Sequence, residues 1–399
     1  MSMSIGNEFG FATKAIHHGY DAIANEGAVS PPIFMTSTFA FESSAEFQAV
    51  FTGESDRCVY GRQQNPTQKL LEQRLAALEG TEAAVVQASG MGAIGSTLLS
   101  LLSAGDQIVV HHTIYATAGS LMDEGLPRFG IDVVRADLST DEGTRKAITP
   151  KTKIVYFETP INPSSEILDI QRISEAAKSV GALVVVDSTF ASPALQRPVE
   201  HGADIVIHSL TKYINGHGDV LAGVAAGPHD IIEKIRTTGA KYVTGATPSP
   251  MSCYLVLRGL KTLPIRMQKH SENALAVAQM LAAHLAVAKV NYPFLDGFTG
   301  KETAVKQMSA GSGMLSFELK AGFDGVAPMI DKLQLISRGI SLGDTDSLIY
   351  HTAGMIEARK KLTPGLQLMP GVSRELVRLS VGLEDVNDII QDLRQALVS

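Results

Sequence analysis

In the middle of the chain, short apolar runs typical of strands alternate with segments whose apolar residues recur at helical spacing. Short runs rich in Val, Ile and other apolar residues are typical of buried strands, and they alternate with helical patterns such as "DIQRISEAAKSVG" at 169–181. The strand-like runs lie at 82–89, 107–112, 132–137, 153–159, 182–189 and 203–209. This alternation predicts an α/β fold with a mostly parallel sheet that is covered on both faces and binds ligands at the carboxyl ends of its strands.

The pattern changes near residue 262. A long helical stretch at 266–286 follows, and then strands and helices in a different order. The N-terminal residues, rich in Ser, Thr, Phe and Pro, suggest an extended arm. We therefore predict an arm at 1–63, a large ligand-binding domain at 64–262 and a smaller C-terminal α/β domain at 263–399.

Composition narrows the class of protein. The chain has 399 residues, 45% of them hydrophobic, which is typical of a folded globular protein. A net charge of -7 disfavours nucleic acid or an anionic membrane surface as a partner. We see neither a signal peptide nor an apolar run long enough to span a membrane. With only two cysteines, the chain is expected to work in the reducing cytoplasm.

The stretch "SGMGAIG" at 89–95 follows a predicted strand and opens a predicted helix. The free N–H groups of such a helix start can bind a phosphate. Gly90, Gly92 and Gly95 also fit a dinucleotide fingerprint, but that interpretation needs an acidic residue at the end of the next strand. That strand ends "VVHHTIY", so a nicotinamide enzyme is the second choice. A tightly packed turn without a ligand is the third.

Two further strand ends carry reactive groups. Asp187 ends the apolar run "VVVDST", and Lys212 follows the next strand between Ser209, Thr211 and a polar turn. A carboxylate for a pyridine nitrogen, a nucleophilic amine, two hydroxyls and a phosphate loop match the needs of pyridoxal phosphate. Taken singly, Asp187 could be a helix cap and Lys212 a solvated loop residue.

Five motifs extend this interpretation: "YGRQQNPT", "ASGMGAI", "VVVDST", "SLTKYINGHGDV" and "LVRLSVGLED". With them the chain resembles the cysteine/methionine-metabolism family of pyridoxal-phosphate enzymes, which includes cystathionine synthases and lyases, homoserine-ester sulfhydrylases and methionine γ-lyase. The resemblance runs from about residue 10 to the C-terminus. It implies the aminotransferase-like fold type I and pyridoxal 5'-phosphate as cofactor.

The resemblance also implies roles for single residues. Lys212 would bind the cofactor covalently, Asp187 would pair with its ring nitrogen, and Tyr115 would stack on the ring and protonate the leaving group. The expected phosphate-binding residues are Ser89, Gly90, Met91, Ser209 and Thr211, with Tyr60 and Arg62 reaching the phosphate of a neighbouring subunit. The expected substrate-binding residues are Asn162, Ser341 and Arg378, with Thr117 and Tyr242 near the γ-substituent. For Arg378 the alternative is a surface ion pair with Glu375 or Glu384.

The choice among family activities depends on a few positions. Ile340 stands where cystathionine synthases and γ-lyases of the family have glutamate, and "SLGD" follows at 341–344, as in methionine γ-lyase. Three departures from that enzyme are Thr117 for cysteine, Tyr242 in place of aspartate, and "TAGMIE" at 352–357. We therefore expect γ-elimination on a γ-substituted amino acid, with a polar or oxygen-linked γ-group such as that of canavanine. The alternative is a γ-replacement synthase or sulfhydrylase acting on a homoserine ester.

The shared phosphate site predicts at least a dimer and, more specifically, a homotetramer with active sites across the dimer interface. No metal is expected, because His208 and His217 lack a suitably spaced third ligand. The pair His111–His112 needs only a solvated or capping role.

Overall fold

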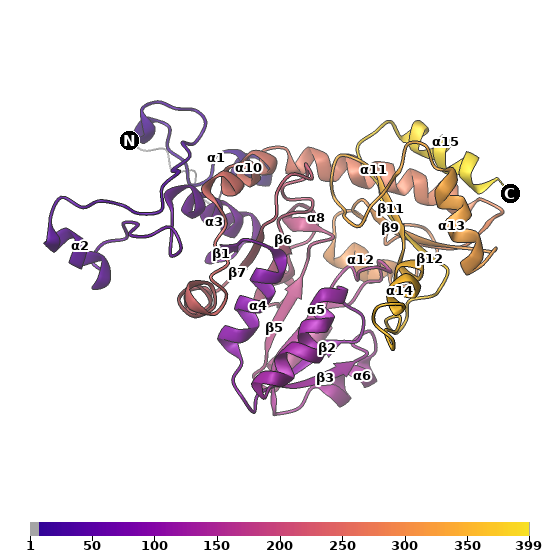
Figure 1. The fold of residues 1–399 in the computed structure, drawn as a ribbon, viewed down its shortest axis with the longest axis horizontal. Coiled ribbons are helices and arrows are strands. Elements are labelled where there is room, and N and C mark those ends of the chain that lie inside the picture. The colour runs from indigo at the N-terminus through magenta and orange to yellow at the C-terminus, as the bar shows by residue number, and fades with distance from the viewer. Residues whose placement is uncertain (1–7, 399) are drawn as a thin grey trace. The chain divides into compact units, whose positions relative to one another are not determined.

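The computed structural model describes residues 8–398, and its contacts group the chain into two compact units (Figure 1). Unit 1 comprises 1–102, 207–211 and 219–262, and unit 2 comprises 103–206, 212–218 and 263–399. The predicted division at residues 63 and 262 stays a prediction. The first seven residues of the predicted arm and Ser399 lie outside the described residues.

The larger sheet has seven strands in the order β1-β7-β6-β5-β4-β2-β3. Their bounds are β1 Ala83–Gln87, β2 Gln107–His111, β3 Asp132–Ala136, β4 Thr152–Glu158, β5 Leu183–Asp187, β6 Ile205–Ser209 and β7 Gly223–Gly227. The pairs β2–β3, β2–β4 and β4–β5 are parallel, which confirms the predicted parallel sheet, whereas β1 pairs antiparallel with β7. The sequence analysis missed β7 because "GVAAG" has neither β-branched enrichment nor alternation.

Helices follow most strands of this sheet. In unit 1 they are α3 Pro66–Glu79, α4 Gly90–Leu101, α9 His229–Lys234, the π-helix η5 Ile235–Thr244 and α10 Pro250–Leu260. In unit 2 they are α5 Ala116–Ser120, η2 Leu121–Gly125, η3 Leu126–Phe129, α6 Asp141–Ala147, α7 Ile170–Lys178, α8 Ser192–Leu195 and η4 Pro198–His201. Apolar residues of α7 pack on those of β4 and β5 in one buried core.

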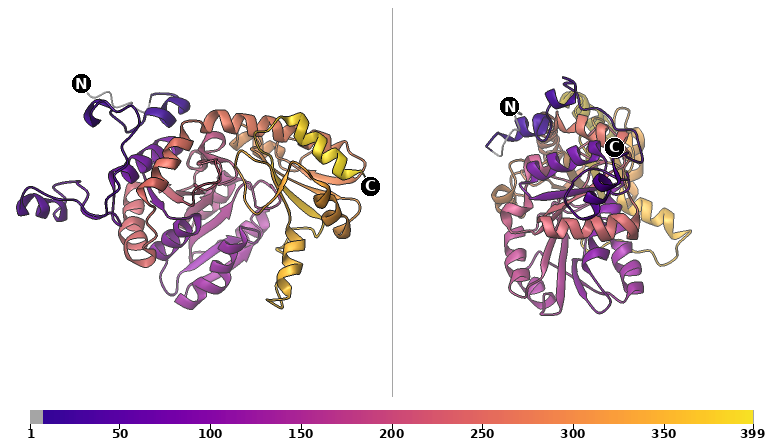
Figure 2. Two further views of the ribbon diagram at one scale, coloured as in Figure 1. Left: turned by 45° about the horizontal axis from the view of Figure 1, so that its top comes forward. Right: turned by 90° about the vertical axis from the view of Figure 1, so that its left-hand side faces the viewer.

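A second, smaller sheet lies within unit 2, in the order β10-β11-β12-β9-β8. Its strands are β8 Val287–Asn291, β9 Met314–Leu319, β10 Ser337–Arg338, β11 Leu348–His351 and β12 Leu376–Ser380. The helices α11 Leu263–Ala282, α13 Phe323–Lys332 and α15 Val386–Leu397 share one apolar core with these strands. The remaining helices are α12 Lys301–Gln307 and α14 Thr352–Lys360, and Figure 2 shows α14 extending from the strands as a separate projection. The predicted smaller α/β domain is thereby confirmed.

The N-terminal segment carries α1 Phe11–His17, the short η1 Ile23–Asn25 and α2 Ser44–Phe51. In Figure 1, α2 lies away from the helices and strands of its own unit. It has no buried residue, and Phe51 remains 67% exposed. These features fit an extended segment, and the predicted arm at 1–63 stays a prediction. Within residues 8–398, no helix combines the length and the apolar character that crossing a membrane requires.

Candidate active site

The glycine loop of unit 1 follows β1 and begins α4. Ser89 is the N-cap residue, and its Oγ accepts the N–H of Gly92 at 3.0 Å. The other N–H groups of the first turn have no partner within the helix, so this end can bind an anion. A Cβ on Gly90 would lie 3.0 Å from the Cβ of Ser209, a tight contact, so a glycine here lets α4 pack closely against the end of β6. The loop of Ser89, Gly90 and Met91 thus lies against Ser209, and the predicted role of these residues at a phosphate stays a prediction.

Thr211 lies two residues beyond β6, and three hydrogen bonds to Ala222 hold it there. Its Oγ1 donates to the carbonyl oxygen of Ala222 at 3.3 Å. The N–H of Ala222 donates to its Oγ1 at 3.1 Å, and its own N–H donates to the carbonyl oxygen of Ala222 at 3.3 Å. Its hydroxyl therefore has a fixed position in the same loop as Ser209. Lys212 is the next residue in the chain.

Tyr60 and Arg62 are exposed at the end of the arm, where Tyr60 bridges to Thr38. The guanidinium of Arg62 lies 5.6 Å from the centre of the Tyr60 ring and donates to the carbonyl oxygen of Lys241 at 2.6 Å. Tyr242 comes next in η5 and is 69% exposed. Their predicted reach into a neighbouring subunit stays a prediction.

In unit 2, four predicted residues form one hydrogen-bonded series. Lys212 donates from Nζ to the Oγ of Ser341 at 2.8 Å. The guanidinium of Arg378 donates to the carbonyl oxygen of Ser341 at 2.9 Å and to Oδ1 of Asn162 at 3.0 Å. Arg378 is only 4% exposed, so the alternative of a surface ion pair is wrong. A buried guanidinium held by two neutral oxygens retains its charge for an anionic ligand.

Burial and charge set the chemistry of Lys212. Burial lowers the pKa of its amine, the positive charge of Arg378 lowers it further, and the carboxyl of Asp344 opposes both. A lysine with a lowered pKa is neutral more often, as a nucleophile or a base must be. Asp344 was not predicted, although it lies in the quoted stretch "SLGD". Tyr350, whose ring lies 4.3 Å from the Arg378 guanidinium carbon, was also missed.

Asp187 and Glu158 end the adjacent parallel strands β5 and β4 and are register partners. Oδ1 of Asp187 accepts the N–H of Thr189 at 3.0 Å. Oε1 of Glu158 accepts the N–H of Tyr115 at 2.7 Å. Tyr115 is the N-cap residue of α5, whose first turn carries Thr117, and both residues are exposed. Glu158 was not predicted, yet the sequence contains the signal: it ends an apolar strand just as Asp187 does.

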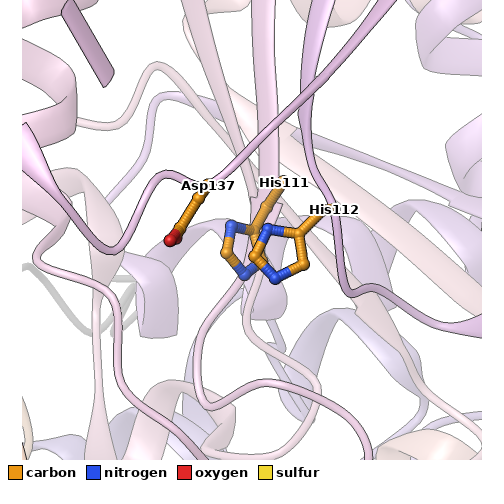
Figure 3. A group of neighbouring side chains, drawn as sticks. All are labelled: His111, His112 and Asp137. Atoms are coloured by element: carbon orange, nitrogen blue, oxygen red, sulfur yellow. The ribbon is translucent and has the colours of Figure 1, made fainter. Parts of the chain in front are cut away.

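A third group of titratable side chains lies at the ends of β2 and β3. Figure 3 shows the imidazole rings of His111 and His112 next to each other, with the carboxyl group of Asp137 to one side. Nδ1 of His111 accepts the N–H of Leu138 at 3.1 Å, and burial lowers the pKa of this imidazole to about 3. The neutral ring therefore carries its proton on Nε2 and has no free lone pair for a metal.

The other two histidines considered as metal ligands are engaged elsewhere in the described chain. Nε2 of His208 and Oε1 of Glu79 lie 2.5 Å apart in a buried pair. Nδ1 of His217 lies 2.6 Å from the carbonyl oxygen of Asn215. Each of these contacts gives the ring a structural role.

Each unit thus offers a distinct chemistry. Unit 1 presents helix N–H groups and hydroxyls suited to a phosphate. Unit 2 presents a nucleophilic amine, a buried guanidinium for a carboxylate, and a carboxylate at the end of β5. Few protein chemistries other than that of a phosphorylated pyridine cofactor need this whole set.

Comparisons with known proteins point in the same direction. A family profile described as "Cys/Met metabolism PLP-dependent enzyme" matches residues 12–398. The L-methionine gamma-lyase of Pseudomonas putida is 44% identical, with 97% of each chain covered. The O-succinylhomoserine sulfhydrylase of Pseudomonas aeruginosa is 40% identical, with 98% of this chain and 95% of the relative covered.

A solved structure of cystathionine gamma synthase from Xanthomonas oryzae pv. oryzae, in complex with aminoacrylate and cysteine, has the same fold. It matches with a TM-score of 0.89 and 38% identity, and the match covers 98% of each chain. The predicted fold class is therefore confirmed.

Proposed function

The chain belongs to the Cys/Met metabolism family of PLP-dependent enzymes, and from this premise we propose that it eliminates the γ-substituent of an α-amino acid. The observation that carries the proposal is the series Lys212–Ser341–Arg378–Asn162 in unit 2. It combines an amine suited to proton transfer with a buried site for a substrate carboxylate. The curated methionine γ-lyases, at 43–45% identity, support elimination over replacement.

The residues present fit pyridoxal 5'-phosphate. The start of α4 has N–H groups without a partner in the helix, and Gly90 there packs against Ser209, so N–H groups and a hydroxyl suited to a phosphate lie together. We assign the phosphate to Ser89, Gly90, Met91, Ser209 and Thr211, the covalent link to Lys212 and the ring nitrogen to Asp187. When bound, the cofactor withdraws electrons from the substrate and so makes the loss of protons from its carbon atoms easier.

Residues of the chain bind the substrate carboxylate, remove a proton and protonate the leaving group. Arg378 binds the substrate carboxylate, with Asn162 and Ser341 fixing the orientation of its guanidinium. Lys212 removes a proton from Cα, for which its lowered pKa suits it. Tyr115 lies in an exposed turn, from which its hydroxyl can donate a proton to the departing γ-substituent.

We further propose that this γ-substituent is more polar than a thioether. Thr117 and Tyr242 are exposed and present hydroxyl groups where the resemblance to methionine γ-lyase implies a cysteine and an aspartate. Hydroxyls that pair with a polar substrate group discriminate strongly against an analogue that leaves them unpaired. Canavanine and homoserine esters are the candidate substrates.

The test compares kcat/KM for canavanine, O-acetylhomoserine, homocysteine and methionine, each with and without an added thiol. We expect 2-oxobutanoate without thiol and a kcat/KM for methionine at least about tenfold below that for the best oxygen-linked substrate. If methionine is the best substrate, the polar pocket is wrong. A strict requirement for thiol would indicate the alternative, a γ-replacement synthase or sulfhydrylase.

We also propose a cytoplasmic homotetramer built from two dimers, with each active site shared across a dimer interface. The exposed arm supports this assembly, because Met35 and Phe51 in it are 66% and 67% exposed in the single chain. Apolar groups gathered on such a segment are typical of a surface that another chain covers.

A further inference from the structure

Glu158 is the one buried carboxyl group at a strand end of the described residues for which the proposed function gives no role. It ends β4, is 4% exposed and forms no ion pair there. A buried carboxylate without a cation is costly, so its presence calls for a specific reason.

Two backbone N–H groups point to that reason. The N–H of Tyr115 donates to Oε1 of Glu158 at 2.7 Å. The N–H of Asn162 is a second donor to the same carboxyl group. Tyr115 belongs to the loop after β2, and Asn162 to the loop after β4. One side chain therefore connects the loop of the proposed acid with a loop that orients Arg378.

Its strand neighbour adds a constraint on charge. Glu158 and Asp187 are register partners in parallel strands, so their side chains leave the same face of the sheet. Burial and the charge of Asp187 raise the pKa of Glu158 well above its usual range. The two N–H donors and the more distant Arg135 oppose this shift without cancelling it.

We propose that Glu158 is a positioning residue that ties Tyr115 to Asn162 next to Asp187 and thereby aligns both sides of the active site. This inference rests on the proposed function, since Tyr115 and Asn162 have their roles there. Burial and the charge of Asp187 favour the protonated form of Glu158, and a neutral Glu158 next to Asp187 would leave on Asp187 the negative charge that a protonated ring nitrogen requires. Ionising both of two adjacent carboxyl groups is unfavourable, so one of the pair takes up a proton more readily than it would alone.

The test uses Glu158→Gln and Glu158→Ala in the holoenzyme. Glutamine resembles a neutral carboxyl group: its oxygen can accept both N–H groups, and its NH₂ group can face Asp187. We expect the glutamine variant to stay within about threefold of the wild type in kcat and KM. The alanine variant should lose at least about tenfold in kcat and also raise KM, because both loops lose their anchor.

Tyr156→Phe is the matched control. Tyr156 lies on the same strand, is fully buried, and its hydroxyl has no hydrogen-bond partner. This variant also removes a buried polar group, but it should leave kcat, KM and the cofactor spectrum unchanged.

A second readout does not depend on turnover. Visible circular dichroism of the bound cofactor reports its fixed orientation, and a titration of cofactor-free protein gives the cofactor Kd. We expect Glu158→Ala to reduce the dichroism and to raise the cofactor Kd, and Glu158→Gln to leave both quantities unchanged. Folded Glu158→Ala protein with wild-type dichroism, Kd and KM would overturn the positioning role. Equal damage from both substitutions would overturn the inference that a neutral group at this position aligns the two loops. If the variants differ in dichroism and cofactor Kd as expected but the wild type does not catalyse γ-elimination, only the proposed reaction is refuted.

Discussion

Lys212 shows how much a single residue depends on its immediate surroundings. Burial and Arg378 lower the pKa of its amine, whereas Asp344 raises it. A Cβ on Gly218 would lie 3.4 Å from the carboxyl carbon of Asp344, so this side chain is packed closely against the turn after Lys212. The three residues together set the fraction of lysine that is neutral at a given pH.

Removing the one group that favours the ammonium form should lower this pKa further. We predict that Asp344→Asn shifts the titration of Lys212 to lower pH, because the carboxylate that favours the ammonium form is lost. The rate of acylation of Lys212 in cofactor-free protein, determined by mass spectrometry after reaction at a series of pH values, measures this titration. The exposed Lys289 serves as the reference in each sample. A shift to higher pH would contradict the assigned role of Asp344.

At the scale of elements, the start of α4 combines tight packing with an open anion site. Gly90 and Gly95 lie in the same helix in different surroundings. A Cβ on Gly90 would meet Ser209, whereas a Cβ on Gly95 would have no other atom within 4 Å. The two glycines therefore separate the effect of the phosphate site from the general effect of glycine in a helix.

We predict that Gly90→Ala raises the Kd for the cofactor at least about tenfold, because Ser209 and the helix start must move apart. Gly95→Ala should leave this Kd unchanged and stabilise the protein by about 0.5–1 kcal/mol, since alanine favours a helix more than glycine. Equilibrium titration and thermal unfolding measure the two quantities. An unchanged Kd for Gly90→Ala would exclude this helix start as the phosphate site.

Elements that carry a strong local pattern could be predicted from the sequence. The strand-like runs predicted β1 to β6, and the helical spacing predicted α7 and α11. The strand β7 could not be predicted, because its glycines and alanines gain stability from pairing with β1 and not from their own propensity. The catalytic lysine candidate could be found from its motif. The resemblance grouped Asn162 and Ser341 with Arg378, and both bind its guanidinium. The contact between Glu158 and Tyr115 could not be predicted, since it joins loops far apart in sequence.

At the scale of the whole molecule, the N-terminal arm is the segment that leaves apolar side chains exposed when the chain is taken alone. Its helix α2 buries none of its residues. The ring centre of Phe47 lies 5.2 Å from that of Phe41, in a tilted arrangement, and 5.2 Å from that of Phe51, in an edge-on one. Phe47 and Phe51 are nevertheless 41% and 67% exposed. An aromatic cluster of this kind, on a segment next to Tyr60 and Arg62, is well placed to contact a second copy of the chain.

A shared active site makes a prediction that no unshared site makes. When a Lys212→Ala chain pairs with an Arg62→Ala chain, one site has both defects and the other has neither, so a heterodimer should regain about half of wild-type activity. Differently tagged chains allow the hybrids to be isolated and assayed against each parent. The matched control pairs the double variant Lys212→Ala/Arg62→Ala with wild type. In a shared arrangement each of its sites carries one defect, so its activity should be close to zero. If the sites are not shared, the results reverse: the first hybrid stays as inactive as its parents, and the control keeps half of wild-type activity.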